Sequence, residues 1–129
     1  MRKKGTTSPA FTSPPFRTGF NNLVWEIVAS IPKGKVATYG QIASLIPRPG
    51  GVGAKYYRAA RARWVGQAMA RCPDGLPWHR VINAQGGISL RSGNDHHIVQ
   101  RRLLEVEGVV FNKSAMVDLG RFLWDPPEV

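Results

Sequence analysis

Few side chains in this sequence could serve as a catalytic nucleophile. The single cysteine, Cys72, stands directly before Pro73, and no histidine lies at a spacing that would obviously activate its thiol. No lysine or aspartate is placed as a plausible nucleophile for a glycosylase. We therefore do not expect the chain to form a covalent intermediate.

The adjacent histidines His96 and His97 suggest a metal site at first sight. Neighbouring residues on a helix point about 100° apart, so the two rings cannot easily share one ion. No third ligand is near them in the sequence, and a zinc site needs at least three protein ligands. We expect neither a metal nor any other cofactor.

Residues 76–83 read Leu-Pro-Trp-His-Arg-Val-Ile-Asn. This stretch resembles the active-site signature of the O6-alkylguanine-DNA alkyltransferases, Pro-Cys-His-Arg-Val. Trp78 stands where that family has its nucleophilic cysteine, and an indole has no thiolate that could accept an alkyl group. A signature that is intact except for the nucleophile is typical of the alkyltransferase-like proteins, which bind the same lesion without repairing it.

Residues 31–43 also resemble the alkyltransferases. Thr38 and Gln41 have the spacing of a capping box, so a helix should begin at Tyr39. Its apolar side should be buried: Ile42, Ala43, Leu45 and Ile46. The resemblance implies that Tyr39 presses on the phosphate 3′ to the target nucleotide and helps to rotate it.

A recognition helix is predicted over residues 55–71, after a connection longer than the turn of a compact helix-turn-helix. Small residues gather near one face, where they allow close approach to another surface: Ala59, Ala62, Gly66 and Ala70. Val65, Ala68 and Met69 should face the core. The resemblance implies that this helix enters the minor groove, where Arg63 fills the gap left by a flipped base. Arg58, Gly66 and Gln67 are further candidate DNA contacts.

The same resemblance implies two more roles around the signature. Arg91 should lie over the flipped purine, through a cation–π contact of about 0.5–2 kcal/mol. It would complete a lesion pocket with Tyr39 and Trp78. His79 should pair with Glu107, and without a thiol to activate this pair would be structural.

The remaining pattern predicts a basic arm and one domain. Residues 1–18 are a flexible basic arm, and residues 19–129 form a single alkyltransferase-like DNA-binding domain. A first helix should turn one apolar face to the core: Phe20, Leu23, Val24, Ile27, Val28 and Ile31. A last helix should be capped by Asn94 or Asp95 and end at Gly108. Its inward apolar face should consist of Val99, Leu103 and Val106.

Composition is consistent with a DNA-binding protein. The 129 residues suffice for one core, and 18 Lys and Arg against 8 Asp and Glu leave a net charge of +10, which indicates a polyanionic partner. A single cysteine fits a reducing compartment, and no apolar run approaches the ~20 residues that span a bilayer. We expect a cytoplasmic monomer without membrane contact.

Together these features predict a mainly α fold with a small β element. It should be an alkyltransferase C-terminal-type domain with a winged-helix-like helix-turn-helix. The predicted function is non-enzymatic recognition of O6-alkylguanine in double-stranded DNA, by flipping the base beside Trp78 and flagging it for nucleotide excision repair proteins. Two alternatives remain open. One is a repair enzyme, either an alkyltransferase using a non-standard residue or a glycosylase using His79 and Glu107. The other is a helix-turn-helix regulator.

Overall fold

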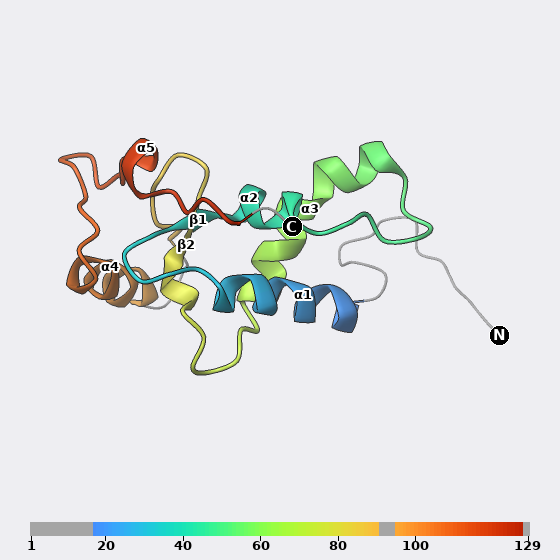
Figure 1. The fold of residues 1–129 in the computed structure, drawn as a ribbon, viewed down its shortest axis with the longest axis horizontal. Coiled ribbons are helices and arrows are strands. Elements are labelled where there is room, and N and C mark those ends of the chain that lie inside the picture. Colours follow the sequence, from blue (N-terminus) through green and yellow to red (C-terminus); the bar gives the residue numbers. More distant parts are fainter. Residues whose placement is uncertain (1–16, 91–94, 128–129) are drawn as a thin grey trace.

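The protein is mainly helical, with one very short sheet near its middle. The computed structural model describes residues 17–90 and 95–127. In chain order the elements are α1 (Arg17–Ala29), β1 (Ala37–Thr38), α2 (Tyr39–Ser44), α3 (Ala54–Met69), the 3₁₀ turn η1 (Trp78–Arg80), β2 (Val81–Ile82), α4 (His96–Val106) and α5 (Leu119–Phe122). The predicted mainly α fold with a small β element is confirmed (Figure 1). No helix among the described residues is long and apolar enough to cross a bilayer.

Helix α1 begins earlier than predicted and buries a narrower face. Residues 17 and 18, assigned to the basic arm, form its first two positions, while residues 1–16 lie outside the described part. Phe20, Val24 and Val28 are buried at four-residue spacing. Leu23, predicted to face the core, is 41% exposed because α2 and α3 cover only one side of this helix.

Helix α2 begins where the capping pattern predicts. The two strands are parallel, with Ala37 opposite Val81, and β1 leads directly into α2. The Thr38 hydroxyl accepts a hydrogen bond from the Gln41 backbone N–H (3.0 Å), which satisfies one free donor of the first turn. Leu45, predicted to be buried, is exposed, since α2 already ends at Ser44.

Helices α2 and α3 form the helix-turn-helix, joined by residues 45–53. This connection is held to the core because Val52 is buried and the Tyr57 hydroxyl donates to the Ile46 carbonyl oxygen (2.8 Å). Trp64 is fully buried and packs edge-on against Phe20, with ring centroids 5.8 Å apart. The core side of α3 includes the three residues predicted for it: Val65, Ala68 and Met69.

Helix α4 turns a different side inward from the one predicted. Gln100 and Leu104 are buried, whereas three residues predicted to face inward are exposed: Val99, Leu103 and Val106. The reason is that the second core cluster is small and includes only Leu104 from α4. Its members are Val36, Ile82, Leu104, Val109, Val117 and Phe122. Asp95 occupies the N-cap position without a side-chain capping bond, Asn94 lies outside the described residues, and Gly108 follows the helix with a positive φ of 96°.

The C-terminal segment packs back on the domain. The Val36 N–H donates to the Phe122 carbonyl oxygen (2.9 Å), and the Trp124 N–H donates to the Val36 carbonyl oxygen (2.7 Å). Phe122 and Trp124 are both buried. This segment therefore extends the pairing of β1 on the side away from β2.

Candidate nucleic-acid interface and pocket

The loop between α3 and β2 presents Trp78 to a cavity. Pro77 has φ −78° and ψ 61°, the geometry of an inverse γ-turn, and the Trp78 N–H donates to the Leu76 carbonyl oxygen (2.8 Å). Proline favours this turn because its ring fixes φ near −65°. Trp78 is half-buried, packs against the main core and lines a cavity of about 380 Å³, a size found among small-ligand sites.

The cavity is lined by residues from four segments of the chain: 39, 69–81, 89 and 96–100. It is lined by Tyr39, Met69, Ala70, Cys72, Pro73, Asp74, Gly75, Leu76, Trp78, Val81, Ser89, His96, His97 and Gln100. The structure thus brings together two residues that the sequence assigned to one pocket, Tyr39 and Trp78. The third, Arg91, lies outside the described residues.

The cavity also contains side chains that sequence reasoning did not assign to it. His96 and His97 line it from the first turn of α4, and the His96 ring lies 6.1 Å from the Trp78 ring between centroids. No signal in the sequence links these histidines to Trp78, because the contact depends on how α4 packs on η1. Within the described residues no three potential metal ligands gather.

Cys72 lines the same cavity, but its surroundings oppose a reactive thiolate. Burial is the main factor that raises the pKa of the Cys72 thiol, and the carboxylate of Asp74 raises it further. A free cysteine already has a pKa of about 8.5, so a thiol with a raised pKa stays protonated at neutral pH. Cys72 is therefore a poor nucleophile in this fold.

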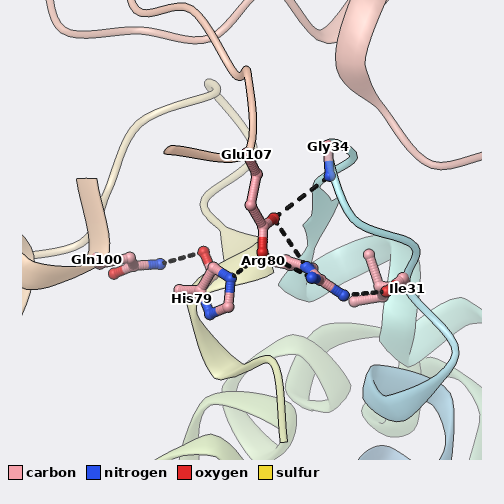
Figure 2. A network of polar contacts seen from close by, with 6 residues as sticks. All are labelled: Ile31, Gly34, His79, Arg80, Gln100 and Glu107. Carbon is pink, nitrogen blue, oxygen red and sulfur yellow. Dashed lines mark hydrogen bonds and ion pairs between the residues drawn. The ribbon is translucent and has the colours of Figure 1, made fainter. Parts of the chain in front are cut away.

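A carboxylate-centred network holds the signature loop (Figure 2). The predicted partners meet, with His79 Nε2 2.8 Å from Glu107 Oε2. Arg80, which the sequence did not single out, donates from Nε to Glu107 Oε1 (2.9 Å) and from Nη2 to Oε2 (2.6 Å). The Gly34 N–H donates to Oε1 (3.3 Å), so Glu107 joins η1 to the α1–β1 turn.

Two further bonds complete this arrangement. Arg80 Nη1 donates to the Ile31 carbonyl oxygen (2.7 Å), and Gln100 Nε2 donates to the carbonyl oxygens of His79 (3.1 Å) and Val81 (2.8 Å). The Arg80 hydrogen bonds, more than those of His79 and Gly34, lower the pKa of Glu107 to about 2 against burial that would raise it. Glu107 is therefore ionised at neutral pH.

The outer face of α3 is basic and has small residues. Arg58 and Arg63 are exposed there with Ala59 and Ala62, while Gly66 is half-buried. A Cβ added at Gly66 would meet nothing within 4 Å, so the backbone is open to an approaching surface. Gln67 is also half-buried. The predicted DNA-contacting residues of α3 therefore lie outside its buried core positions, which include Val65 and Ala68. They are Arg58, Arg63, Gly66 and Gln67.

Comparison with known proteins agrees with this geometry. Residues 19–109 match the sequence profile described as "6-O-methylguanine DNA methyltransferase, DNA binding domain". The chain is 45% identical over 108 residues to the DNA base-flipping protein of Escherichia coli, a match that covers 82% of this chain and 74% of that protein. It is 37% identical over 113 residues to alkyltransferase-like protein 1 of Schizosaccharomyces pombe, covering 83% of this chain and 95% of the relative.

A solved structure of a relative has the same fold. The crystal structure of S. pombe Atl1 in complex with damaged DNA containing O6-carboxymethylguanine aligns with a TM-score of 0.68 and 36% identity. The alignment covers 84% of this chain and 97% of that one. The helix-turn-helix, the signature loop and the helix after it therefore belong to one known domain type.

Proposed function

Because this chain belongs to the family of the 6-O-methylguanine DNA methyltransferase DNA-binding domain, we propose that it is a non-enzymatic sensor of O6-alkylguanine in duplex DNA. The observation that carries the proposal is that Trp78, which the sequence resemblance places at the nucleophile position, lies beside a cavity of about 380 Å³. The relatives named as base-flipping and alkyltransferase-like proteins, one of them bound to damaged DNA, support it.

Lesion recognition by flipping has a simple energetic basis. Extruding a base costs a few kcal/mol, and the cost falls when pairing is already damaged. An alkyl group on guanine O6 removes the N1 proton and weakens the pair with cytosine. In our proposal α3 enters the minor groove with contacts from Arg58, Gly66 and Gln67. Arg63 then fills the gap, and Tyr39 turns the 3′ phosphate.

The flipped base would enter the cavity beside Trp78. The indole offers an apolar wall for the alkyl group and one N–H donor. Arg91 would cover the purine, and the His79–Glu107 pair would fix the loop rather than move protons. Since Cys72 has a raised pKa, the alkyl group would stay on the guanine.

The protein's product would then be a marked site rather than a repaired base. We propose that it acts as a cytoplasmic monomer with no cofactor, and that nucleotide excision repair proteins receive the bound lesion. Its net charge of +10 would supply the general attraction to DNA. The basic N-terminal arm proposed from the sequence would add to that attraction.

Two assays on the same duplexes test the sensor function. In a gel-shift comparison, the protein should bind a duplex with O6-methylguanine more tightly than the undamaged duplex. With a radiolabelled methyl group on the DNA, no label should move to the protein. Equal affinity for both duplexes would contradict lesion sensing.

The second candidate function is alkyl transfer to Cys72, because that thiol lines the same cavity as Trp78. Transfer would leave a thioether on Cys72 and an unmodified guanine in the DNA. Label that is found on the wild-type protein and absent from Cys72→Ala would establish this enzyme in place of the sensor. Label on neither protein favours the sensor.

A further inference from the structure

The proposed function assigns no role to the two histidines at the start of α4. His96 and His97 are the first two residues of this helix, and both line the cavity beside Trp78. His96 is exposed, and its ring lies 6.1 Å from the Trp78 ring between centroids. His97 is half-buried and belongs to neither core cluster. The place of His97 in the fold is therefore the wall of the cavity rather than the core.

His97 differs from a histidine that the fold holds in place. Its Nδ1 atom is buried and makes no hydrogen bond within residues 17–90 and 95–127. Buried polar atoms in native proteins are nearly always paired, because an unpaired atom has lost its bonds to water and gained none in the protein. His79, in contrast, has its Nε2 atom 2.8 Å from Glu107 Oε2. His97 thus has a hydrogen-bonding capacity that the described fold leaves unused.

The His97 ring can turn a nitrogen toward the cavity at little cost. Half a turn about the Cβ–Cγ bond exchanges Nδ1 with Cδ2, and no hydrogen bond from Nδ1 within the described residues opposes this turn. In a neutral imidazole one nitrogen donates and the other accepts, and the bond that one nitrogen makes selects the tautomer. The side chain can therefore bond either a donor or an acceptor of a ligand in the cavity.

The neighbouring polar side chain on this wall is already engaged. Gln100, one turn after His97 on α4, donates from Nε2 to the carbonyl oxygen of His79 (3.1 Å; Figure 2) and to that of Val81 (2.8 Å). These two bonds use both N–H groups of the amide. Ligand sites combine apolar walls with a few polar groups that fix the orientation of the ligand. On the α4 wall, His97 is the side chain suited to that task.

We propose that His97 is a hydrogen-bonding contact of the flipped base and provides part of the affinity for the lesion. The inference rests on the proposed function, because it needs a base in the cavity. An O6-alkylguanine has ring nitrogens that accept and an amino group that donates, so it can satisfy the imidazole in either tautomer. Trp78 in η1 then covers the alkyl group, and His97 in α4 holds the purine.

The test measures the affinity of the full chain for three duplexes by fluorescence anisotropy. One contains O6-methylguanine, one guanine, and one a tetrahydrofuran abasic analogue at the same position. His97→Phe keeps a ring and removes both nitrogens. It should weaken binding to the O6-methylguanine duplex about fivefold, through the loss of one hydrogen bond. The other two affinities should stay unchanged, because neither duplex puts a base in the cavity.

Two further variants serve as rescue and control. His97→Asn has an amide that branches from Cγ as Nδ1 does, so it should bind the lesion more tightly than His97→Phe. Val99→Phe places the same ring at an exposed position of α4 and should leave all three affinities unchanged. Urea unfolding adds an independent measurement. His97→Phe should unfold at the same or a higher urea concentration than wild type, since it removes an unpaired buried nitrogen.

Four outcomes would overturn the role of His97. They are an unchanged lesion affinity in His97→Phe, an equal loss on the abasic duplex, the same loss in Val99→Phe, and a lower urea midpoint for His97→Phe, which would show a structural residue. The wild-type protein keeps the two proposals apart. If it does not prefer O6-methylguanine to guanine, the sensor function fails. If it has that preference and His97→Phe retains it in full, only the role of His97 fails.

Discussion

At the scale of single residues, the side chains that line the cavity decide what the site can do. Trp78 keeps the frame of the signature, and the inverse γ-turn at Pro77 directs it to the cavity wall. The one thiol nearby, Cys72, has a raised pKa through burial and Asp74. These side chains offer a ligand apolar contact and hydrogen bonding.

Arg63→Ala should weaken binding to an O6-methylguanine duplex by about 1–3 kcal/mol, because the gap left by the flipped base would no longer be filled. Gel-shift titrations on damaged and undamaged duplexes measure this loss. Arg102→Ala, which removes an exposed arginine from α4, is the control for the general loss of charge. A loss of equal size on undamaged DNA would contradict the role of Arg63 in the flipped state.

At the scale of elements, the Glu107 carboxylate joins three segments of the chain. It binds Arg80 and His79 in η1 and Gly34 in the α1–β1 turn from the end of α4. Both Arg80 and Glu107 are largely buried. Removing one partner of such a pair leaves the other charge unpaired, which is why we expect this network to determine the stability of the signature loop.

Glu107→Gln should lower the free energy of unfolding at pH 7 by about 3 kcal/mol. This value follows because folding lowers the pKa of Glu107 from 4.5 to about 2. Because the folded pKa lies below the unfolded one, this stabilisation is present above about pH 4.5 and is lost as the pH falls toward 2. Urea unfolding from pH 7 to pH 2 measures it, and the variant should show a flatter profile. Glu105→Gln, with its exposed partner, is the control. The same flattening in that control would refute the assignment.

The orientation of α4 gives a second prediction at this scale. Leu104→Ala should cost about 2–5 kcal/mol of unfolding free energy, since Leu104 is fully buried in the second core cluster. Val106→Ala should change it by no more than about 0.5 kcal/mol, because the side chain is in solvent. Chemical denaturation of both variants tests this, and a larger loss in Val106→Ala would mean that the helix is turned the other way.

At the scale of the whole molecule, the net charge and the cavity beside Trp78 would contribute to DNA binding in different ways. In the proposed function the charge of +10 would attract any duplex, whereas the cavity beside Trp78 would distinguish one base from another. General attraction depends on counterion release, and recognition of a flipped base depends on contacts within the pocket. These two contributions should respond differently to salt.

Raising the salt concentration from 50 to 200 mM should weaken binding to damaged and undamaged duplexes in parallel, with the same slope of log affinity against log salt. The ratio of the two affinities should stay nearly constant, because both complexes neutralise the same phosphates. Fluorescence anisotropy titrations at four salt concentrations measure both quantities. A ratio that falls steeply with salt would show that lesion preference is itself electrostatic.

The sequence by itself determined the local elements and the identity of the domain. The capping spacing of Thr38 and Gln41 predicted the start of α2, and the signature around Trp78 predicted the family. Such features depend on neighbours in the chain, so a local pattern contains them. The core side of α3 at Val65, Ala68 and Met69 was also predictable from helical spacing.

Only the tertiary structure decided the rest. The inward side of α4 depends on where the second cluster and the carbonyl oxygens of His79 and Val81 lie, which selects Gln100 and Leu104 and leaves Val106 in solvent. Arg80 belongs to the Glu107 network, and His96 lines the cavity, because segments far apart in the chain pack together. The spacing of apolar residues predicts that a helix has a buried side. Which side is buried depends on the apolar residues and hydrogen-bond acceptors of the segments that pack against the helix.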